Sequence, residues 1–460
     1  MGNDWLNILL LRRTFFNHSQ NPVNYAKTEG KSMQNSTNSN ANYRYQITII
    51  GILFAVFGFV TWLNSILIPF LKKSCELSDQ QAYYVATAFF FAYFVMALPS
   101  SWILERLGTK KGMTLGLFIM SAGALIFIPA AESRSYGMFL SGLFVLGTGL
   151  ALLQTASNPY VSVIGPIESA AKRISIMGVC NKAAGIMANL LFGTLLLKNA
   201  DAIQKQLSDA AITAEAKAQL LGELAGRVVM PYSVLAVFLA LVGIVIYRSS
   251  LPDISSQASH EADGDTELSR GRTSIFQFPH TILGALAIFT YVGAEVMAGD
   301  VITIYGKNLG FSEDTSKFFT TFGLIGLLVG YFVSIVLIPK YVMQERWLAV
   351  SAVLGIILSV VSYFASGSVA VGCLAAMGFS NAVMWPAIFP LGIKDLGRFT
   401  NTGSALLIMG ILGGAVIPPF YGWLYERSGL GLDFRAAFLA IMFVCYGYIL
   451  FYALRGSRPK

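Results

Sequence analysis

Long apolar runs separated by short polar segments dominate the chain. Twelve such runs lie at 46–70, 83–104, 112–131, 137–164, 174–198, 229–248, 278–305, 316–339, 347–366, 368–392, 402–424 and 434–454. Each is long enough to supply the about 20 residues that a helix needs to cross a hydrocarbon core of about 30 Å. Runs such as VVMPYSVLAVFLALVGIVIY do not alternate apolar with polar residues, as the strands of an outer-membrane barrel do. The pattern therefore predicts an all-α membrane protein with about twelve transmembrane helices.

Polar segments divide these helices into two groups of six. Residues 1–45 are polar, rich in Asn and Ser and without a signal-peptide hydrophobic region, so we expect a disordered cytoplasmic tail, with Met33 as a candidate for the true start. The segment 250–277 is rich in Asp, Glu and Ser, which is typical of a linker. The expected domains are a six-helix half at 46–249, a cytoplasmic linker at 250–277 and a second half at 278–455.

The distribution of Lys and Arg predicts the orientation of the chain. A net charge of +8 is compatible with a nucleic-acid partner, but the basic residues are in excess in the loops on the side of the N-terminus. Such an excess marks the cytoplasmic face of a membrane protein. Only 12% of the residues are charged, against about 25% in soluble domains. We therefore expect a multi-pass protein of the cell inner membrane, with both termini cytoplasmic and no nucleic-acid partner.

The cysteines and histidines give no indication of a metal site or an enzyme. The four cysteines fall in or near apolar helices without paired spacing: Cys75, Cys180, Cys373 and Cys445. This spacing predicts buried core residues and neither a disulfide framework nor a metal cluster. The three histidines lie in a tail, a linker or at a helix edge: His18, His260 and His280. With no nucleophile or metal constellation, an intramembrane enzyme is disfavoured, and no metal or cofactor is expected.

Three ionisable residues lie inside predicted helices, where a charge costs about 2.5–3.5 kcal/mol on insertion scales. Lys182 and Glu295 lie at similar depth in the fifth and seventh helices, so their side chains can meet, whereas Asp300 lies nearer the outer surface. A carboxylate or a lysine in the membrane can take up and release a proton during a transport cycle, which makes all three candidate coupling residues. The alternatives are a static ion pair or hydrogen bond for Lys182 and Glu295, snorkelling for Lys182, and a helix cap or entry funnel for Asp300.

Neutral polar and aromatic side chains gather on the first, fourth, fifth and tenth helices. A sugar site needs donors and acceptors for the hydroxyls and an aromatic surface for the apolar face of the ring. The candidate binding residues are Trp62, Asn64, Gln154, Asn158, Asn181, Asn381 and Trp385. A single amide in a membrane helix is more often a contact between helices than a ligand contact, but the clustering favours substrate binding.

The two groups of helices carry a faint internal repeat. SIMGVCNKAAG at 175–185 and LIMGILGGAV at 407–416 align on a shared Ile-Met-Gly, and Asn158 corresponds to Trp385, each followed by a proline. The turn after the second helix reads ERLGTKKG at 105–112, similar to a loop signature of facilitator transporters. Two parallel six-helix halves around a midplane site are the plan of the major facilitator fold, in which one half rocks against the other.

Several motifs together resemble one family. They are TWLNSILIPFLK at 61–72, GTGLALLQTASNPYVSVIGP at 147–166, KRISIMGVCNKAAG at 172–185, YVGAEV at 291–296 and GFSNAVMWPAIFPLGIKDLG at 378–397. With them, nearly the whole chain after residue 45 resembles the fucose:proton symporter family, including its glucose/galactose transporter branch, within the major facilitator superfamily. The resemblance implies twelve helices, a central sugar site and uptake driven by a cation gradient.

The chain departs from the fucose carriers at the positions linked to proton coupling. The acidic residue of the first-helix motif is Ser65 here, and the glutamate of the fourth helix is Gln154. Asn181 of the fifth helix is retained and is followed by Lys182. Glu295 matches the glucose/galactose branch, so the resemblance makes it the expected coupling residue, with a proton or sodium as the coupling ion.

The expected function is secondary active uptake of a hexose-type sugar, of the glucose/galactose/fucose class, by cation symport with alternating access. The expected partners are the small-molecule sugar and the lipid bilayer, with no obligate protein partner, and the expected state is a monomer. Two alternatives use the same fold. One is an efflux or exchange carrier for an anionic or modified sugar, and the other is a membrane sugar sensor that does not transport.

Overall fold

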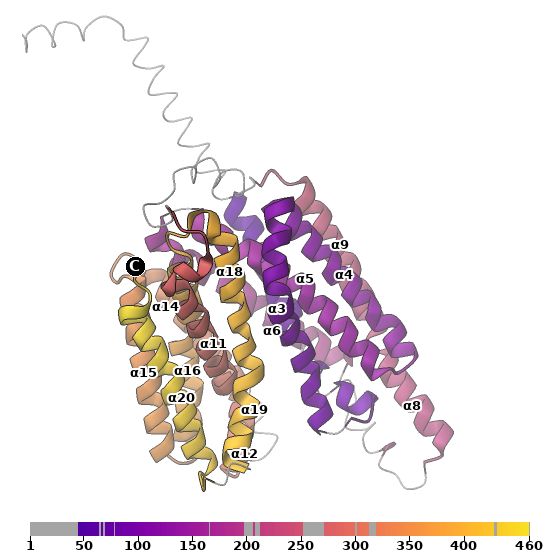
Figure 1. Cartoon of the computed structure of the whole chain (residues 1–460). Helices are drawn as coiled ribbons and strands as arrows, with labels where there is room; N and C mark the ends of the chain where they lie inside the picture. The colour runs from indigo at the N-terminus through magenta and orange to yellow at the C-terminus, as the bar shows by residue number, and fades with distance from the viewer. Residues whose placement is uncertain are drawn as a thin grey trace, which may run out of the picture. The chain divides into compact units, whose positions relative to one another are not determined.

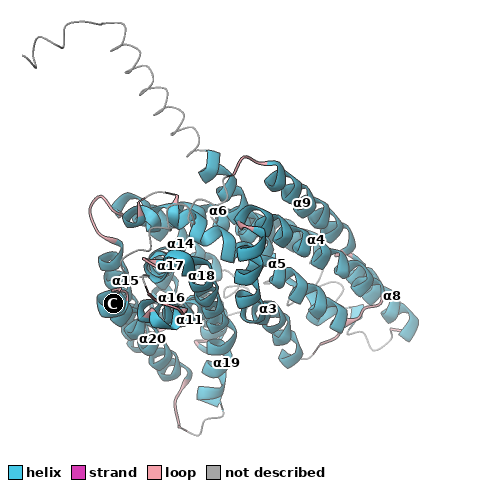
Figure 2. Ribbon diagram, turned by 45° about the horizontal axis from the view of Figure 1, so that its top comes forward, coloured by secondary structure: helices cyan, strands magenta, loops and turns pink. Residues whose placement is uncertain are grey.

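All regular structure among the described residues is helical, which confirms the predicted all-α class (Figures 1 and 2). The computed structural model describes residues 45–63, 66–67, 70–77, 79–164, 166–196, 206–207, 212–251, 271–299, 301–311, 319–426 and 430–459. The first helix runs Tyr45–Leu63. The others are α3 (Asp79–Leu107), α4 (Thr109–Glu132), α5 (Tyr136–Val163), α6 (Ala170–Leu196), α8 (Ala214–Gly226), α9 (Val229–Arg248), α11 (Pro279–Gly299), α12 (Val301–Asn308), α14 (Phe319–Leu337), α15 (Gln344–Phe364), α16 (Gly367–Asn381), α17 (Met384–Ile393), α18 (Thr400–Met409), α19 (Gly413–Glu426) and α20 (Phe434–Phe451).

These helices follow the predicted apolar runs closely. Within the described residues, 11 helical stretches are long and apolar enough to cross a membrane. The predicted run at 174–198 corresponds to α6, which is helical over 27 residues but is not one of those 11. Five strongly exposed side chains of α9 recur every three or four residues and are apolar: Met230, Val234, Val237, Leu241 and Val245. Such a stripe fits a helix that borders lipid.

Two predicted spans are interrupted, and both interruptions border the central cavity. The span predicted at 368–392 divides into α16 and α17 around Ala382, because Pro386 has no N–H to donate to the carbonyl of Ala382. The span predicted at 402–424 divides into α18 and α19, which are joined by a 3-10 turn at Gly410–Leu412. A single apolar run cannot reveal such breaks, because periodicity does not register a local change of hydrogen bonding.

One helix, α8, lies in the segment between the predicted spans at 174–198 and 229–248. Thr213 caps its N-terminus by accepting a hydrogen bond from the N–H of Ala216 at 3.2 Å. The helix packs against α4 and buries Leu221 and Leu224. Lys217 of α8 forms an ion pair with Glu76 at 2.6 Å, which ties this helix to the segment after the first helix.

Residues Ile50–Lys460 form one unit in which two sets of helices meet. The helices α3, α4, α5 and α9 pack on one another, and so do α11, α14, α15, α16 and α20 (Figure 1). The sets join where α6 packs on α14 and α17, and where α18 packs on α3 and α5. The predicted boundary between the halves stays a prediction. Most of the expected linker and all but the last residue of the expected tail lie outside the described residues.

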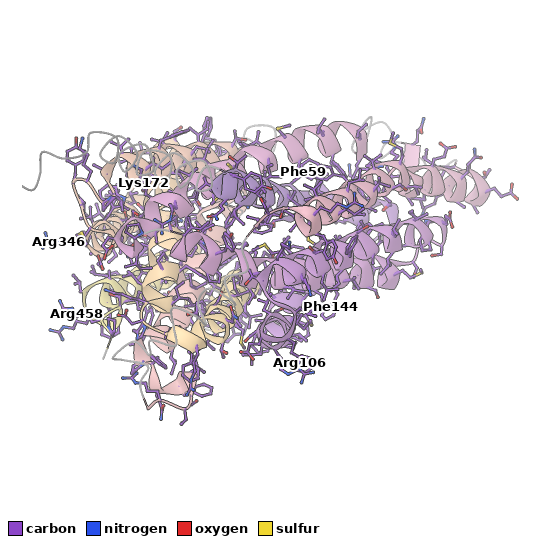
Figure 3. The ribbon with its side chains drawn as sticks, turned by 90° about the horizontal axis from the view of Figure 1, so that it is seen from above. Phe59, Arg106, Phe144, Lys172, Arg346 and Arg458 are labelled. Carbon is purple, nitrogen blue, oxygen red and sulfur yellow. The ribbon has the colours of Figure 1, made fainter. Side chains whose placement is uncertain are left out.

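The contact between α3 and α18 closes one end of the bundle. The hydroxyls of Ser101 and Thr402 lie 3.3 Å apart, and Thr402 donates to the Glu105 carboxylate at 3.4 Å. Beside them, the Ser404 hydroxyl donates to the carbonyl of Thr155 at 3.2 Å. This is the end predicted to face the cytoplasm. Seen from above, three exposed arginines, which lie between the predicted spans or after the last of them, point outward from the helices: Arg106, Arg346 and Arg458 (Figure 3).

Candidate functional site

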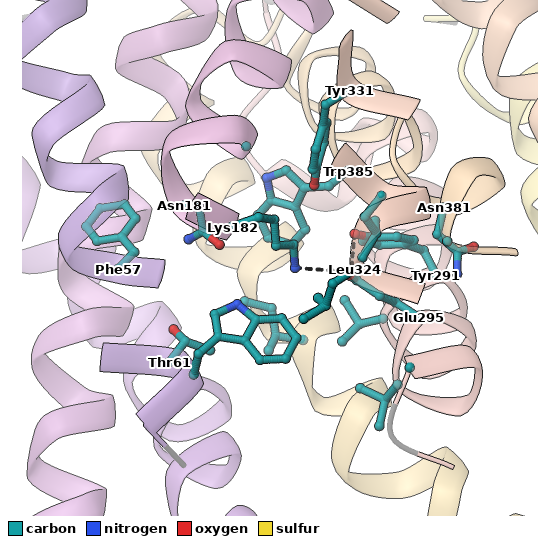
Figure 4. Close-up of a pocket in the computed structure, with 18 of the residues that line it drawn as sticks. Phe57, Thr61, Asn181, Lys182, Tyr291, Glu295, Leu324, Tyr331, Asn381 and Trp385 are labelled. Carbon is teal, nitrogen blue, oxygen red and sulfur yellow. Dashed lines mark hydrogen bonds and ion pairs between the residues drawn. The ribbon is translucent and has the colours of Figure 1, made fainter. Parts of the chain in front are cut away.

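A cavity of about 260 Å³ lies between the two sets of helices. Side chains of the first helix and of α3, α5, α6, α11, α14, α16 and α17 line it. Most of the lining is apolar or aromatic, and a small number of amides and two opposite charges interrupt it (Figure 4). Mostly apolar walls with a few convergent polar groups are typical of a small-molecule site.

The two charges of the cavity form an ion pair between α6 and α11. Lys182 Nζ lies 3.0 Å from Glu295 Oε1, and the two side chains are 11% and 20% exposed (Figure 4). Lys182 occupies the middle of α6, and Glu295 occupies the middle of the stretch from α11 to α12. The contact between Lys182 and Glu295, which their similar depths in the sequence analysis allowed, is therefore present. Its role in coupling remains a prediction.

The second carboxylate oxygen of Glu295 also has a partner. Tyr291 Oη donates to Glu295 Oε2 at 2.5 Å, from one turn earlier in α11. Tyr291 was not among the predicted site residues, although the spacing of four residues in YVGAEV places the Tyr291 and Glu295 side chains on one face of a helix. The two carboxylate oxygens of Glu295 thus accept from one cationic donor, Lys182, and one neutral donor, Tyr291.

The indole ring of Trp62 lies beside the Lys182 ammonium. Lys182 Nζ lies 4.7 Å from the centroid of the Trp62 ring, within the range of a cation–π contact. The close fit continues along α6, where a Cβ on Gly185 would lie 2.2 Å from an atom of the Trp62 ring. Trp62, predicted as a binding residue, therefore lines the cavity and contacts the ammonium at the same time.

A chain of hydrogen bonds connects α3, α5 and α17 along the cavity. Gln154 Nε2 donates to Tyr93 Oη at 3.0 Å, and Asn158 Nδ2 donates to the Gln154 carbonyl at 2.9 Å. Trp385 Nε1 in turn donates to Asn158 Oδ1 at 3.3 Å. Three residues predicted from the sequence therefore lie together in one network. Tyr93 joins it without having been predicted, because a tyrosine in an apolar run carries no distinguishing pattern.

The other two predicted amides have different surroundings. Asn181 Nδ2 donates to the carbonyl of Phe54 at 3.3 Å, so part of this side chain joins α6 to the first helix. Gly58 permits that approach, because a Cβ there would lie 1.9 Å from the Asn181 carbonyl oxygen. Asn381 accepts a hydrogen bond from Tyr446 Oη at 2.9 Å, while its buried Nδ2 has no hydrogen-bond partner among the described residues.

Two of the predicted site residues, Asn64 and Asp300, lie outside the described residues. Among the residues that the structure describes, no group of three or more His, Cys, Asp or Glu is placed to hold a metal ion. The four cysteines are free. Burial is as expected for Cys373 and Cys445, whereas Cys75 and Cys180 are only partly buried.

Comparisons with known proteins agree with this fold and site. The sequence profile of the Major Facilitator Superfamily matches residues 50–410. A protein named glucose/galactose transporter from Brucella abortus biovar 1 (strain 9-941) is 34% identical over 429 residues, which are 93% of this chain and 97% of that protein. The L-fucose-proton symporter of Escherichia coli (strain K12) is 28% identical over 405 residues, which are 87% of this chain and 91% of that protein.

A solved structure extends the likeness to the fold. The crystal structure of the transporter FucP in the outward conformation is 28% identical in sequence and covers 91% of this chain and 100% of its own, with a TM-score of 0.77. The family resemblance of the sequence motifs is thereby confirmed, as is the predicted fold of about twelve transmembrane helices. The chain belongs to the major facilitator superfamily.

Proposed function

We propose that this protein takes up a hexose-type sugar, of the glucose/galactose/fucose class, by cation symport with alternating access. The observation that carries the proposal is the cavity in which indoles and amides surround one ammonium–carboxylate pair. The names of the relatives support it, since one at 34% identity is a glucose/galactose transporter and one at 28% identity is an L-fucose-proton symporter.

The size and lining of the cavity suit a monosaccharide. Its volume of about 260 Å³ falls just below the range of about 300–1,000 Å³ that drug-sized ligands need. Trp62 and Trp385 supply aromatic surface for the apolar face of a sugar ring. The amides of Gln154, Asn158 and Asn381 supply donors and acceptors for hydroxyl groups, with Asn181 as a further contact from α6.

Glu295 is the proposed acceptor of the coupling cation. It carries the sole carboxylate among the described residues that line the cavity, since Gln154 replaces the glutamate of the fucose carriers. The proposed ion is a proton, which agrees with the name of the symporter from Escherichia coli, and sodium is the alternative outcome. The ion pair with Lys182 speaks against an anion carrier, because Glu295 already neutralises the single lysine among those lining residues.

We place the protein in the inner membrane as a monomer with both termini cytoplasmic. Alternating access would rock the half at 46–249 against the half at 278–455, around a site to which α6 and α11 contribute the central pair. In the present conformation the proposed cytoplasmic end is closed by the contact between α3 and α18.

Uptake into proteoliposomes tests this function. Radiolabelled glucose, galactose, fucose and N-acetylglucosamine would be offered under an imposed pH or sodium gradient. We expect the wild type to accumulate at least one hexose above equilibrium, and Glu295→Gln to lose accumulation while retaining sugar exchange. Glu215→Gln, on the exposed first turn of α8, is the matched control and should behave like the wild type.

Two results would contradict the proposed function, and a third would contradict the role of Glu295. Counterflow of sugar phosphates without hexose transport would indicate an exchange carrier for anions. Sugar binding without translocation would indicate a sensor. Accumulation that is unchanged in Glu295→Gln would leave symport in place but remove this carboxylate from the coupling.

A further inference from the structure

We infer that Lys182 is a tethered counter-cation. In the sugar-free protein it occupies the cation position at Glu295, neutralises the carboxylate, and so allows the empty carrier to change conformation without a bound proton or sodium ion. The inference rests on the proposed symport function and assigns to Lys182 the return half of the cycle.

The geometry allows either the Lys182 ammonium or a transported cation, but not both, to bind the same oxygen of Glu295. Lys182 Nζ lies 3.0 Å from Glu295 Oε1, and Tyr291 Oη occupies Oε2. Tyr291 is neutral and can continue to donate when the carboxyl group is protonated or binds sodium. A cation that binds at Oε1 therefore displaces Lys182, since two positive charges on one carboxylate oxygen repel each other.

Among the described groups around Glu295, Lys182 carries the charge that balances the carboxylate. Lys182 faces it from α6 and Tyr291 from its own helix. Tyr331 of α14 and Tyr446 of α20 are near enough to interact electrostatically with its charge. Among these described neighbours Lys182 is the cation, so removal of its charge leaves a partly buried carboxylate without a cationic partner among them.

When a cation displaces the Lys182 side chain from Glu295, other groups inside the cavity can interact with it. Its ammonium already lies 4.7 Å from the centroid of the Trp62 ring and has three donor hydrogens. Sugar hydroxyls are acceptors for those donors. Cation binding at Glu295 therefore frees donors that a bound sugar satisfies, which makes the binding of cation and sugar cooperative.

Charge balances over the cycle. In the empty carrier the ammonium and the carboxylate sum to zero. In the loaded carrier a proton from the outer solution neutralises Glu295, Lys182 keeps its own proton, and the site carries one positive charge. Release of the sugar and that proton inside restores the pair, so that each cycle moves one proton inward with each sugar.

Transport by charge variants tests the inference. We expect Lys182→Met still to exchange sugar, but with a raised KM, because the side chain no longer donates to the sugar. Its maximal net uptake should fall at least about tenfold, because its empty form must return with a bare carboxylate in the membrane. Lys182→Arg keeps the charge and should recover net uptake in part. Lys182→Met/Glu295→Gln removes both charges and should restore net downhill flux without dependence on the cation gradient. The exposed Lys340→Met is the matched control.

A second measurement requires no sugar. Ser101 is 4% exposed beneath its contact with Thr402, so a cysteine at 101 in a cysteine-free background reacts with maleimide when that end opens. At pH 8 and without sodium, we expect Lys182→Met to slow this reaction at least about tenfold relative to Lys182→Met/Glu295→Gln. Acidic pH or added sodium should remove the difference.

The outcomes separate the two proposals. A wild type that transports no hexose overturns the proposed function, while the labelling rates still decide the role of Lys182. Wild-type transport with equal net uptake in Lys182→Met overturns the inference alone. A labelling rate in Lys182→Met that equals or exceeds that of the double variant also overturns it.

Discussion

Trp385 of α17 donates its indole N–H to Oδ1 of Asn158 in α5, at 3.3 Å. The internal repeat of the sequence matches these two positions, each of which precedes a proline. Asn158 is held in place because its own Nδ2 donates to the Gln154 carbonyl one turn earlier. Trp385 in turn stacks on Phe389 with ring centroids 5.8 Å apart. One wall of the cavity is thus an aromatic surface that a hydrogen bond between helices and the stacking on Phe389 hold in place.

Trp385→Phe removes this hydrogen bond and keeps an aromatic face. A neutral hydrogen bond contributes about 0.5–1.5 kcal/mol, so we expect the KM for sugar uptake to rise by roughly 2–10-fold with little change in maximal rate. Trp385→Ala removes the ring as well and should have a larger effect. Initial rates in proteoliposomes measure both.

The control for this experiment is Trp423→Phe. Trp423 is 48% exposed on α19 and stacks on Phe420 away from the cavity. A KM that changes equally in Trp423→Phe, or not at all in Trp385→Phe and Trp385→Ala, would remove Trp385 from the binding surface.

The helices and the central ion pair were accessible from the sequence for a physical reason. Membrane spans reveal themselves by length and hydrophobicity, and a charge inside such a span is costly enough to need a partner. The similar depths of Lys182 and Glu295 in their helices therefore show from the sequence that the two side chains can meet. The clustering of Gln154, Asn158 and Trp385 could be predicted for a similar reason, because few polar side chains occur in these helices.

The orientation of side chains within the site was not accessible in the same way. Asn181 donates to the Phe54 carbonyl, and Asn381 accepts from Tyr446, contacts that depend on how helices distant in sequence rotate against each other. The contact of Tyr291 with Glu295 could have been predicted from the sequence, since the two residues are one helical turn apart. The break after Asn381 depends on a proline four residues beyond Ala382, a signal that the apolar pattern hides.

Gly178→Ala should open the end of the bundle where α6 meets α14. A Cβ at this position would lie 2.7 Å from ring atoms of Tyr331, closer than side chains tolerate. Overpacking costs about 1–3 kcal/mol, so the ratio of closed to open forms should fall at least about fivefold. Maleimide modification of Ser101→Cys, as described above, should become faster.

A compensating change tests the steric origin of this effect. Tyr331→Ala in the Gly178→Ala background removes the ring and should return the modification rate toward that of the parent. Gly422→Ala on α19 is the control, since a Cβ there meets no atom within 4 Å. Equal rates in Gly178→Ala and Gly422→Ala would show that the contact does not limit closure.

Arg173 holds the beginning of α6 against the end of α5. It is 4% exposed, and its guanidinium donates to the carbonyls of Val161, Ser162 and Pro166 and to the Ser169 hydroxyl, at 2.7–3.1 Å. A lysine keeps the charge but cannot reach these acceptors together. We expect Arg173→Lys to destabilise the protein by about 2–4 kcal/mol, because buried carbonyls lose their donors. The half-life of folded protein in detergent at fixed temperature measures this, with Lys172→Met as the neighbouring control.

Cys75 reports the orientation of the chain. With both termini cytoplasmic, the segment after the first helix is extracytoplasmic, so an impermeant maleimide added to right-side-out vesicles should label Cys75. Burial raises the pKa of the Cys75 thiol, and this outweighs the opposing effects of the Ser74 hydrogen bond and the Arg134 charge. Because the thiolate is the nucleophile, a raised pKa lowers reactivity at neutral pH, and the rate should climb by about tenfold per pH unit between pH 7 and 9.

The labelling experiment uses protein in which Cys180, Cys373 and Cys445 are replaced by Ser, with Cys75→Ser in the same background as the blank. Denatured protein gives the rate of the unburied thiol, which should exceed the native rate at pH 7 and converge with it as pH rises. Labelling only in inverted vesicles would reverse the proposed orientation and place the contact between α3 and α18 at the outer end. A native rate equal to the denatured rate at pH 7 would show instead that Cys75 is fully accessible, and that burial near Ser74 and Arg134 does not control its reactivity.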